Sequence, residues 1–255
     1  AVRAQCAALI DAAGPACVAV KPQLACFERL GADGWTALAA TAAYARERGL
    51  LVLADAKRGD ISVSAAAYAQ ALVGSTPTPF GAVEGLSADA FTANPLLGVD
   101  ALAPLIDGAR AAGAGVFVLV RTSNPGAADI EDLALAGDDA ETVWERVARI
   151  VDRLGAPPSP VSGLSEVGAV VGATRPEHVA RMRELMPHAP FLLPGIGAQG
   201  GRVEDLAPAF APGRAGGLVS ASRSIASAHE STGAAPAVAA RAEAERLRES
   251  AWTLS

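Results

Sequence analysis

The sequence predicts an α/β protein with a parallel sheet, and a (β/α)8 TIM barrel is the architecture that best fits it. Short runs rich in Val, Leu, Ile, Ala and Phe recur along the 255 residues, and longer amphipathic stretches separate them. These runs are continuously apolar, which is typical of strands that helices cover on both faces of a parallel sheet. Because such a barrel has about 250 residues in one domain, we expect residues 1–255 to form a single domain.

Seven of these apolar runs are expected to be strands. They span residues 16–22, 50–56, 88–94, 115–122, 167–174, 191–197 and 217–223. A (β/α)8 barrel needs eight strands. Since the C-terminal end finishes with a helix at 235–250, we expect the missing first strand to lie upstream of Ala1. An open doubly wound sheet is the structural alternative.

Helices are expected between the strands, including residues 34–48, 64–72, 139–154 and 176–186. Thr174 and Glu177 have the spacing of a capping box at the start of the last of these helices. The richest loop signals are at 75–81 and 155–163, and neither separates regions of different composition. The chain therefore shows no domain boundary.

Charge and composition exclude several classes of partner. With 21 basic and 27 acidic residues, the net charge of −6 argues against binding to the phosphate backbone of nucleic acids. No apolar run reaches the roughly 20 residues that cross a bilayer, and Asp11 interrupts the first stretch where a signal peptide would stay apolar. The three cysteines have no metal-type spacing and are expected to be reduced thiols: Cys6, Cys17 and Cys26. These features predict a cytoplasmic protein that binds neither nucleic acid nor membrane.

Lysine occurs only twice in the chain, at Lys21 and Lys57. A genome that favours Ala, Gly and Arg codons explains why lysine is rare, but it does not explain where the two lysines lie. Arg can replace a solvated lysine at little cost, whereas it cannot replace a lysine that must release a proton. The positions of both lysines therefore deserve a chemical explanation.

A charged cluster interrupts the apolar run LLVLADAKRGDIS. Asp55 and Lys57 are two residues apart at a strand end and therefore point to the same side, and Asp60 follows in the turn. Lys21 ends the preceding strand, about 4.8 Å away in a parallel sheet, so that its ammonium can reach Asp55 or Lys57. Unlike charges 4 Å apart attract by about 4 kcal/mol at an effective dielectric constant of 20, which keeps the carboxylates ionised and the lysines protonated. A salt-bridged strand end without chemistry is the structural alternative.

The last two strands carry a second signal, in LLPGIGAQGG and VSASRSI. Glycines let backbone N–H groups approach an anion closely, and Arg223 can bind a phosphate with two N–H groups. Barrels commonly bind phosphate with the loops after strands 7 and 8. Although PGIGAQGG alone could be an ordinary turn, its combination with Ser222 and Arg223 favours a phosphate site.

Taken together, these motifs resemble the orotidine 5′-monophosphate decarboxylase family. DAKRGD fits the family signature D-x-K-x-x-D, and VKPQ, TSNPG, PGIGAQGG and SRS occur in the family's order. The resemblance covers nearly the whole chain and is closest to the longer bacterial branch. It implies decarboxylation of orotidine 5′-monophosphate to uridine 5′-monophosphate, the last step of de novo pyrimidine biosynthesis, with no metal or organic cofactor.

The resemblance also implies a role for individual residues. Lys57 would protonate C6 of the pyrimidine, and three residues would complete the charged array: Lys21, Asp55 and Asp60. Asp60 would reach into the neighbouring subunit's site together with Ile61 and Ser64, which implies a homodimer. The remaining contacts would be Ser123 to the base, Pro194 against the pyrimidine, and Gln199 and Arg223 to the phosphate.

One feature of the family has no match in the chain. The family's first strand carries an Asp that contacts the ribose, whereas the only Asp before Lys21 is Asp11, in a helical stretch. Either that residue lies upstream of Ala1, on the missing strand, or the chain lacks one ligand and the closure of the barrel.

Three other functions compete with this interpretation. A Mg²⁺-dependent sugar-phosphate decarboxylase or synthase of the same superfamily needs a further acidic ligand, where this chain has Lys21. A Schiff-base aldolase needs a neutral lysine, whereas Asp55 and Asp60 keep Lys57 protonated. A non-catalytic barrel that binds phosphometabolites would show a damaged charge array.

Overall fold

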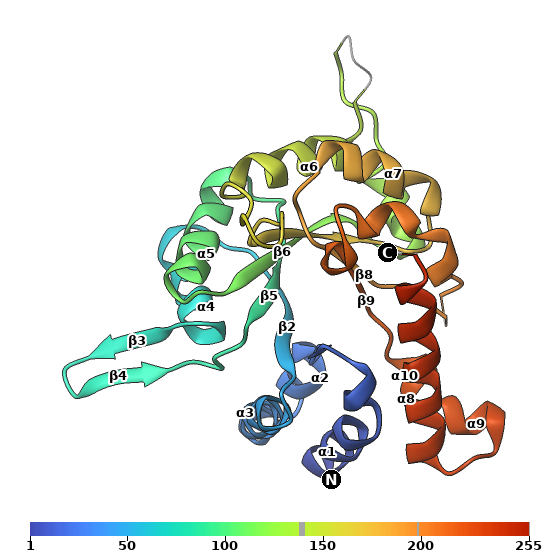
Figure 1. The fold of residues 1–255 in the computed structure, drawn as a ribbon. Coiled ribbons are helices and arrows are strands. Elements are labelled where there is room, and N and C mark those ends of the chain that lie inside the picture. The colour runs from blue at the N-terminus through green and yellow to red at the C-terminus, as the bar shows by residue number, and fades with distance from the viewer. Residues whose placement is uncertain (138–140, 198, 255) are drawn as a thin grey trace.

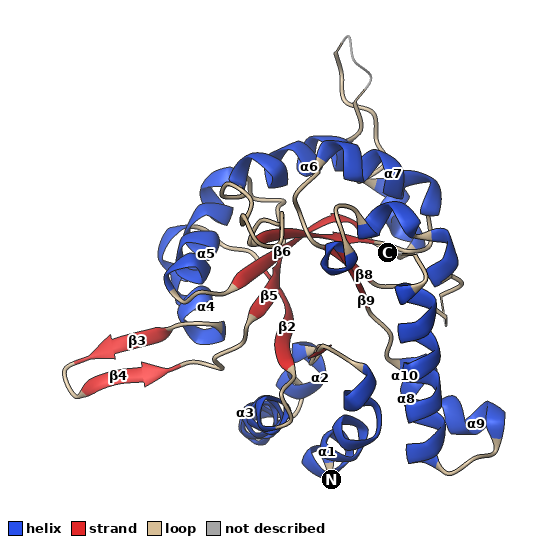
Figure 2. Ribbon diagram, in the orientation of Figure 1, coloured by secondary structure: helices blue, strands red, loops and turns tan. Residues whose placement is uncertain are grey.

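The computed structural model contains a curled sheet of seven parallel strands with helices around its outer face (Figure 1, Figure 2). It describes residues 1–137, 141–197 and 199–254. In spatial order, the strands of the sheet are β1 (Ala19–Val20), β2 (Leu51–Arg58), β5 (Ala90–Ala93), β6 (Gly115–Arg121), β7 (Val167–Val171), β8 (Phe191–Leu193) and β9 (Gly217–Val219). Each strand is parallel to the next.

The winding of the sheet is that of a barrel. Its spatial order follows the order of the strands along the chain, whereas a doubly wound sheet reverses direction at a switch point. The doubly wound alternative is therefore wrong, and each of the seven predicted runs contains a strand of the sheet. Within the described residues the sheet forms part of a barrel, with β1 and β9 at its edges. A first strand upstream of Ala1 stays a prediction.

Helices follow most strands and pack on the outer face of the sheet (Figure 2). The α-helices are α1 (Val2–Ala13), α2 (Leu24–Glu28), α3 (Gly31–Glu47), α4 (Ser62–Leu72), α5 (Val99–Ala111), α6 (Val143–Leu154), α7 (Pro176–Leu185), α8 (Arg223–Ala226), α9 (Ala228–Thr232) and α10 (Pro236–Trp252). Short 3-10 helices cover Gly14–Ala16, Pro125–Asp129, Val203–Asp205, Ala207–Phe210 and Arg214–Gly216. No helix in the described part of the chain combines the length and the hydropathy of a membrane span.

The first and the last α-helix of the described chain pack against each other. Helices α1 and α10 pack side by side (Figure 1), and Arg241 Nε donates a hydrogen bond to the carbonyl oxygen of Ala12 at 3.2 Å. Both helices also contact the 3-10 helix Gly14–Ala16, which precedes β1 in the chain.

The predicted capping box at Thr174 and Glu177 is wrong. Helix α7 has Arg175 at its N-cap and no side-chain cap, because the Thr174 hydroxyl donates instead to the carbonyl oxygen of Ser123 at 3.1 Å. A capping box does occur at α6, where Thr142 and Glu145 bond each other's backbone N–H groups. Helix α6 begins at Val143, and positions 139 and 140 of the predicted helix lie outside the described residues.

The loop predicted at 75–81 is also wrong, because this segment belongs to a β-hairpin. Strands β3 (Ser75–Thr78) and β4 (Gly81–Glu84) are antiparallel and project from the body of the molecule (Figure 1). The Thr78 hydroxyl donates to the carbonyl oxygen of Gly81 at 2.6 Å across the turn. Pro77 suggested a loop, but proline is tolerated in edge strands, and both strands of a two-stranded hairpin are edges.

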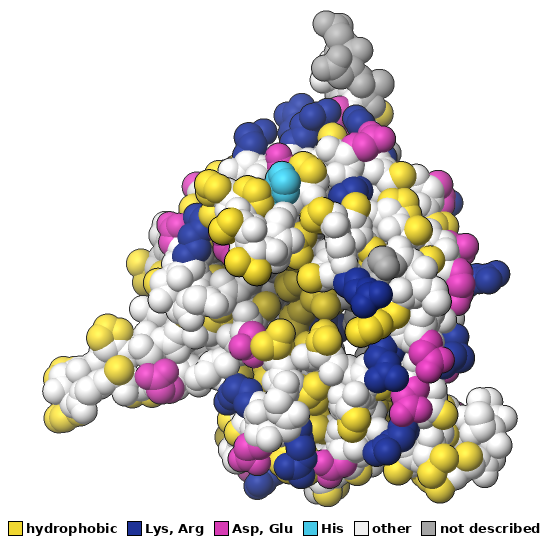
Figure 3. All heavy atoms as spheres, viewed as in Figure 1, with side chains coloured by type: hydrophobic (Ala, Val, Ile, Leu, Met, Phe, Trp, Pro, Cys, Tyr) yellow, Lys and Arg dark blue, Asp and Glu magenta, His cyan; other side chains and the backbone are white. Residues whose placement is uncertain are grey.

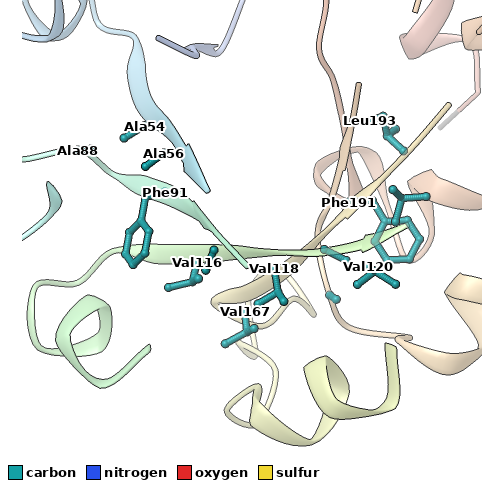
Figure 4. Packing of buried hydrophobic residues seen from close by; sticks show 14 of the residues in the cluster. Ala54, Ala56, Ala88, Phe91, Val116, Val118, Val120, Val167, Phe191 and Leu193 are labelled. Atoms are coloured by element: carbon teal, nitrogen blue, oxygen red, sulfur yellow. The ribbon is translucent and has the colours of Figure 1, made fainter. Parts of the chain in front are cut away.

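The core confirms that the strands are buried on both faces. On β6, Val116, Val118 and Val120 pack with residues of the outer layer such as Phe91 and Phe191 (Figure 4). The alternate residue Phe117 belongs to a smaller inner cluster with Leu53, Val170 and Leu192. Two apolar layers, one on each side of the sheet, explain why the strand sequences are continuously apolar.

Candidate active site

A pocket of roughly 480 Å³ lies at the carboxyl ends of the parallel strands, where barrels carry their active sites. Most of the predicted site residues line it, namely Lys21, Asp55, Lys57, Ser123, Pro194, Gln199 and Arg223. They come from the carboxyl ends of five strands, namely β1, β2, β6, β8 and β9. Apolar side chains on the inner face of the sheet also line the pocket, including Leu119, Val170 and Leu192. On the face drawn in Figure 3, the surface is hollowed near its middle, with hydrophobic side chains at the floor.

Asp55 is the centre of the polar cluster in this pocket. Its side chain is only 7% exposed, and Lys21 Nζ lies 2.5 Å from its Oδ2 atom. Lys57 donates to Oδ1, and the Thr92 hydroxyl also lies 3.1 Å from Oδ1. The convergence of Lys21, Asp55 and Lys57 is therefore confirmed.

The two lysines control the protonation of this carboxylate. Burial acts to raise the pKa of Asp55, but the charges and hydrogen bonds of Lys21 and Lys57 together outweigh burial and hold the pKa below its ordinary value. Asp55 is therefore an anion at neutral pH, beside two ammonium groups. Such an array can repel a carboxylate and donate a proton at the same place.

The backbone at Lys57 departs from regular strand geometry. Its φ angle is +49°, in the left-handed region that residues other than glycine rarely adopt. The register between β2 and β5 shifts between Ala54 and Arg58, which marks a bulge of the kind that re-aims side chains beside active sites. The Lys57 N–H donates to Thr92 Oγ1 at 2.8 Å.

The loop after β8 forms the other end of the pocket. Gly195 and Gly197 have φ angles of +102° and +72°, which favour glycine. Gly201 N donates to the carbonyl oxygen of Gly195 at 3.0 Å, so the loop folds back on itself. Gln199 and Arg223 line the pocket beside this loop, and together they provide an amide and a guanidinium that can bind a phosphate.

Three predicted site residues lie outside the pocket. Asp60 and its neighbours Ile61 and Ser64 lie at the start of α4, and none of them lines the pocket. The Oδ1 atom of Asp60 accepts a hydrogen bond from Ile61 N at 2.7 Å, and Ile61 is 56% exposed. Their predicted role in a neighbouring subunit's site stays a prediction.

The pocket lining includes residues that were not singled out from the sequence, and Thr92 and Gln23 are the two that contact Asp55. Thr92 on β5 is 1% exposed, and the only signal for it was one hydroxyl within the apolar stretch AFTAN. Gln23 pairs with Asp55 through a parallel backbone bridge, and its signal was its place in the motif VKPQ.

Comparison with known proteins agrees with this geometry. The model of the "Orotidine 5′-phosphate decarboxylase / HUMPS family" matches residues 2–238. The chain is 47% identical to an orotidine 5′-phosphate decarboxylase of Deinococcus radiodurans over 218 residues, which are 85% of this chain and 74% of the relative. It is 41% identical to the protein of that name from Rhodopirellula baltica over 228 residues, or 88% and 72% of the two chains.

Solved structures show the same fold. The OMP decarboxylase of Leishmania donovani matches with a TM-score of 0.75 and 34% identity, over 99% of this chain and 87% of that one. The orotidine 5′-monophosphate decarboxylase of Methanocaldococcus jannaschii, at 18% identity, matches in fold with a TM-score of 0.70, over 97% and 92% of the chains. From the family model and these relatives, the chain belongs to the orotidine 5′-phosphate decarboxylase / HUMPS family.

Proposed function

We propose that this protein decarboxylates orotidine 5′-monophosphate to uridine 5′-monophosphate. The observation that carries the proposal is the buried Asp55 carboxylate, held between the ammonium groups of Lys21 and Lys57 in the pocket. The relatives described above have the name of this activity, and Asp55 and Lys57 of the motif D-x-K-x-x-D meet Lys21 in this chain.

The chemistry follows from the charges in the pocket. The substrate carboxylate is placed against Asp55, which repels it. When the bond between C6 and the carboxylate breaks, its electron pair stays on C6 and CO₂ departs. The Lys57 ammonium then donates a proton to C6. Because the ammonium is in place before the carbanion forms, it favours the transition state over the bound substrate, and no step draws on a metal or an organic cofactor.

The other end of the pocket binds the rest of the nucleotide. In this proposal Gln199 and Arg223 bind the phosphate, Ser123 contacts the base and Pro194 lies against the pyrimidine ring. Phosphate binding far from C6 contributes to catalysis because it holds the reactive end of the substrate in place.

A homodimer with shared sites completes the proposal. Asp60, Ile61 and Ser64 would reach the pocket of a second copy. Support comes from the surface around them, because the loop after β2 adjoins the loop after β5 through the hydrogen bond from Asn94 N to the Arg58 carbonyl at 2.8 Å. These two loops and the adjoining helix starts expose the apolar side chains Ile61, Val63, Leu96 and Leu97, and grouped apolar surface marks interaction sites. A cytoplasmic location is also proposed, in keeping with three free cysteines.

The surroundings of Asp55 favour this reaction over the alternatives. A Mg²⁺-dependent enzyme needs a divalent cation beside this carboxylate, where Lys21 Nζ lies at 2.5 Å, and no group of three or more His, Cys, Asp or Glu in the described residues is arranged to hold a metal. A Schiff-base aldolase needs a neutral amine, whereas Lys57 is paired with a carboxylate. A barrel that only binds phosphometabolites has no need of this array.

The direct test follows the ultraviolet absorbance of orotidine 5′-monophosphate in the presence of a metal chelator. The full-length protein is expected to convert the substrate, and Lys57→Ala is expected to lose at least the roughly 10²- to 10⁴-fold that a general acid contributes. Full activity of Lys57→Ala, or activity that appears only when Mg²⁺ is added, would contradict the proposal.

A further inference from the structure

Thr92 is the one uncharged side chain that hydrogen-bonds both Asp55 and Lys57 among the described residues. It lies on β5, next to β2 in the sheet, and is 1% exposed. Its Oγ1 atom lies 2.8 Å from the backbone nitrogen of Lys57 and 3.1 Å from Oδ1 of Asp55.

The direction of both hydrogen bonds is fixed by chemistry. The Lys57 N–H can only donate, so Thr92 Oγ1 accepts there. The ionised Asp55 carboxylate can only accept, so the single hydroxyl proton of Thr92 points to Oδ1. Lys57 Nζ donates to the same Oδ1 atom. A closed ring of hydrogen bonds therefore runs from the Lys57 backbone through Thr92 and Asp55 to the Lys57 side chain.

This ring holds a backbone conformation that the strand alone does not favour. Lys57 has a φ angle of +49° at the bulge in β2, and such conformations persist only where the surroundings hold them. A bulge also removes the regular acceptor that a neighbouring strand offers to a backbone N–H. Thr92 supplies that acceptor for the Lys57 N–H and thereby fixes the backbone position from which the Lys57 side chain extends.

The same hydroxyl limits the rotation of the Asp55 carboxylate. If the Asp55 carboxylate could rotate freely, it would turn away from the substrate carboxylate and thereby lower the repulsion between them. The repulsion therefore acts on the substrate only if Asp55 is held in place. Lys21 holds Oδ2. On Oδ1, the Lys57 ammonium must leave to deliver its proton to C6, and Thr92 is the donor that stays.

We propose that Thr92 is a positioning residue of the decarboxylation, orienting the Asp55 carboxylate and the Lys57 backbone at once. This inference rests on the proposed function. It assigns to Thr92 no contact with the reacting atoms, because its one hydroxyl proton goes to Asp55 Oδ1 and its oxygen accepts from Lys57 N.

Two substitutions separate the hydroxyl from the volume of the side chain. Thr92→Val keeps the shape and removes the hydroxyl, and Thr92→Ser keeps the hydroxyl. Thr41→Val is the matched control, because Thr41 is also buried and its hydroxyl donates to the Ala37 carbonyl at 2.8 Å within α3, outside the pocket. Misplacement of reacting groups by about 1 Å costs on the order of 10²-fold in rate. We therefore expect Thr92→Val to lower kcat by about 10- to 100-fold with little change in KM, and Thr92→Ser and Thr41→Val to keep the kcat of the wild type.

The dependence of kcat/KM on pH distinguishes a positioning role of Thr92 from a merely structural one. Loss of a hydrogen bond to the ionised carboxylate raises the pKa of Asp55, so the acid limb of kcat/KM is expected at higher pH in Thr92→Val and unchanged in Thr92→Ser and Thr41→Val. Wild-type kcat in Thr92→Val, or an acid limb that does not move, would overturn the role of Thr92. The failure of the proposed function is a separate result, since the wild-type protein itself would then not convert orotidine 5′-monophosphate.

Discussion

Lys21 Nζ lies 2.5 Å from Oδ2 of Asp55, although the two residues belong to different strands and are 34 positions apart. The contact joins the end of β1 to β2, where Asp55 N also donates to the Pro22 carbonyl at 3.0 Å. It leaves Oδ1 for Lys57 and Thr92. Lys21 and Lys57 therefore act on different oxygen atoms of Asp55, and together they keep the carboxylate ionised.

Removing Lys21 is predicted to shift the acid limb of activity. Its charge is the largest influence that lowers the pKa of Asp55 against the opposing effect of burial. In Lys21→Met the pKa of Asp55 rises, the carboxylate is protonated at higher pH, and kcat/KM falls earlier on acidification. Loss of a neighbouring opposite charge moves a pKa by about 1 to 3 units, which a kcat/KM profile against pH resolves. Lys21→Arg keeps the charge and is expected to keep the limb; an unmoved limb in Lys21→Met would contradict the assignment.

Arg223 is predicted to recognise the phosphate of the nucleotide. Arg223→Ala removes a charged donor from the pocket, and a hydrogen bond to a charged group contributes about 1.5 to 3 kcal/mol. Binding of uridine 5′-monophosphate is therefore expected to weaken by about 10- to 100-fold, while binding of uridine, which has no phosphate, stays the same. Calorimetric titration with both ligands measures this difference.

The control for this variant is Arg202→Ala. Arg202 follows the loop after β8, and its side chain is 70% exposed. Its Nε atom lies 3.6 Å from Glu204, and it does not line the pocket. Its removal is expected to leave both affinities unchanged. Equal weakening of nucleotide and nucleoside binding in Arg223→Ala would assign Arg223 to the fold of the pocket instead of to phosphate.

The sequence predicted the parts of the site that regular geometry determines. Strand alternation predicted Asp55 and Lys57 on one side, and the parallel order of the sheet predicted Lys21 beside them. The two side chains do meet, although a bulge interrupts the regular alternation at Lys57. Thr92 could not be predicted in the same way, because its partner Asp55 is 37 positions away and one hydroxyl in an apolar strand has no periodicity. The capping prediction for Thr174 failed for a related reason, since a carbonyl 51 positions away accepted its hydroxyl. Local patterns determine which elements form, whereas hydrogen bonds between elements depend on the assembled fold.

Sites shared between two subunits are predicted to show complementation. Lys57→Ala and Asp60→Ala are each expected to be inactive alone, because each damages every site of its own dimer. In a mixed dimer, one site combines an intact Lys57 with an intact Asp60 from the partner. Random exchange of subunits of the isologous dimer then restores about a quarter of the sites. Activity after the two inactive variants are mixed and allowed to exchange tests this directly, and no recovery in a mixture shown to contain hybrid dimers would place Asp60 in the site of its own chain.

Arg183 is a buried cation that lies far from this chemistry. It is 9% exposed, its Nη1 donates to the Met186 and Ala189 carbonyls at 2.9 and 2.8 Å, and its Nη2 donates to the Ala209 carbonyl at 2.8 Å. Its guanidinium also lies 3.8 Å above the centre of the Phe191 ring. Burial lowers the pKa of Arg183 to about 10, so it stays charged at neutral pH. It does not form an ion pair with any acidic residue in the described segments. Its hydrogen bonds join the end of α7 to Ala189, just before β8, and to the 3-10 helix Ala207–Phe210, and its ring contact reaches Phe191 on β8.

Arg183→Met is predicted to destabilise the fold without changing the chemistry. The apolar chain of Met fills part of the space but leaves several buried carbonyl oxygens without donors, and each unsatisfied polar group costs about 1 to 3 kcal/mol. The free energy of unfolding, measured in urea, is therefore expected to fall by about 3 kcal/mol or more, while kcat of the folded protein is unchanged because Arg183 does not line the pocket. Arg181→Met on the same helix is the control, because Arg181 is 45% exposed and pairs with the carboxylates of Glu145 and Glu184, and an ion pair of an exposed arginine contributes about 1 kcal/mol or less. Similar losses in the two variants would mean that the carbonyl contacts of Arg183 add nothing beyond a surface ion pair, and the link between α7 and β8 would then depend on apolar packing alone.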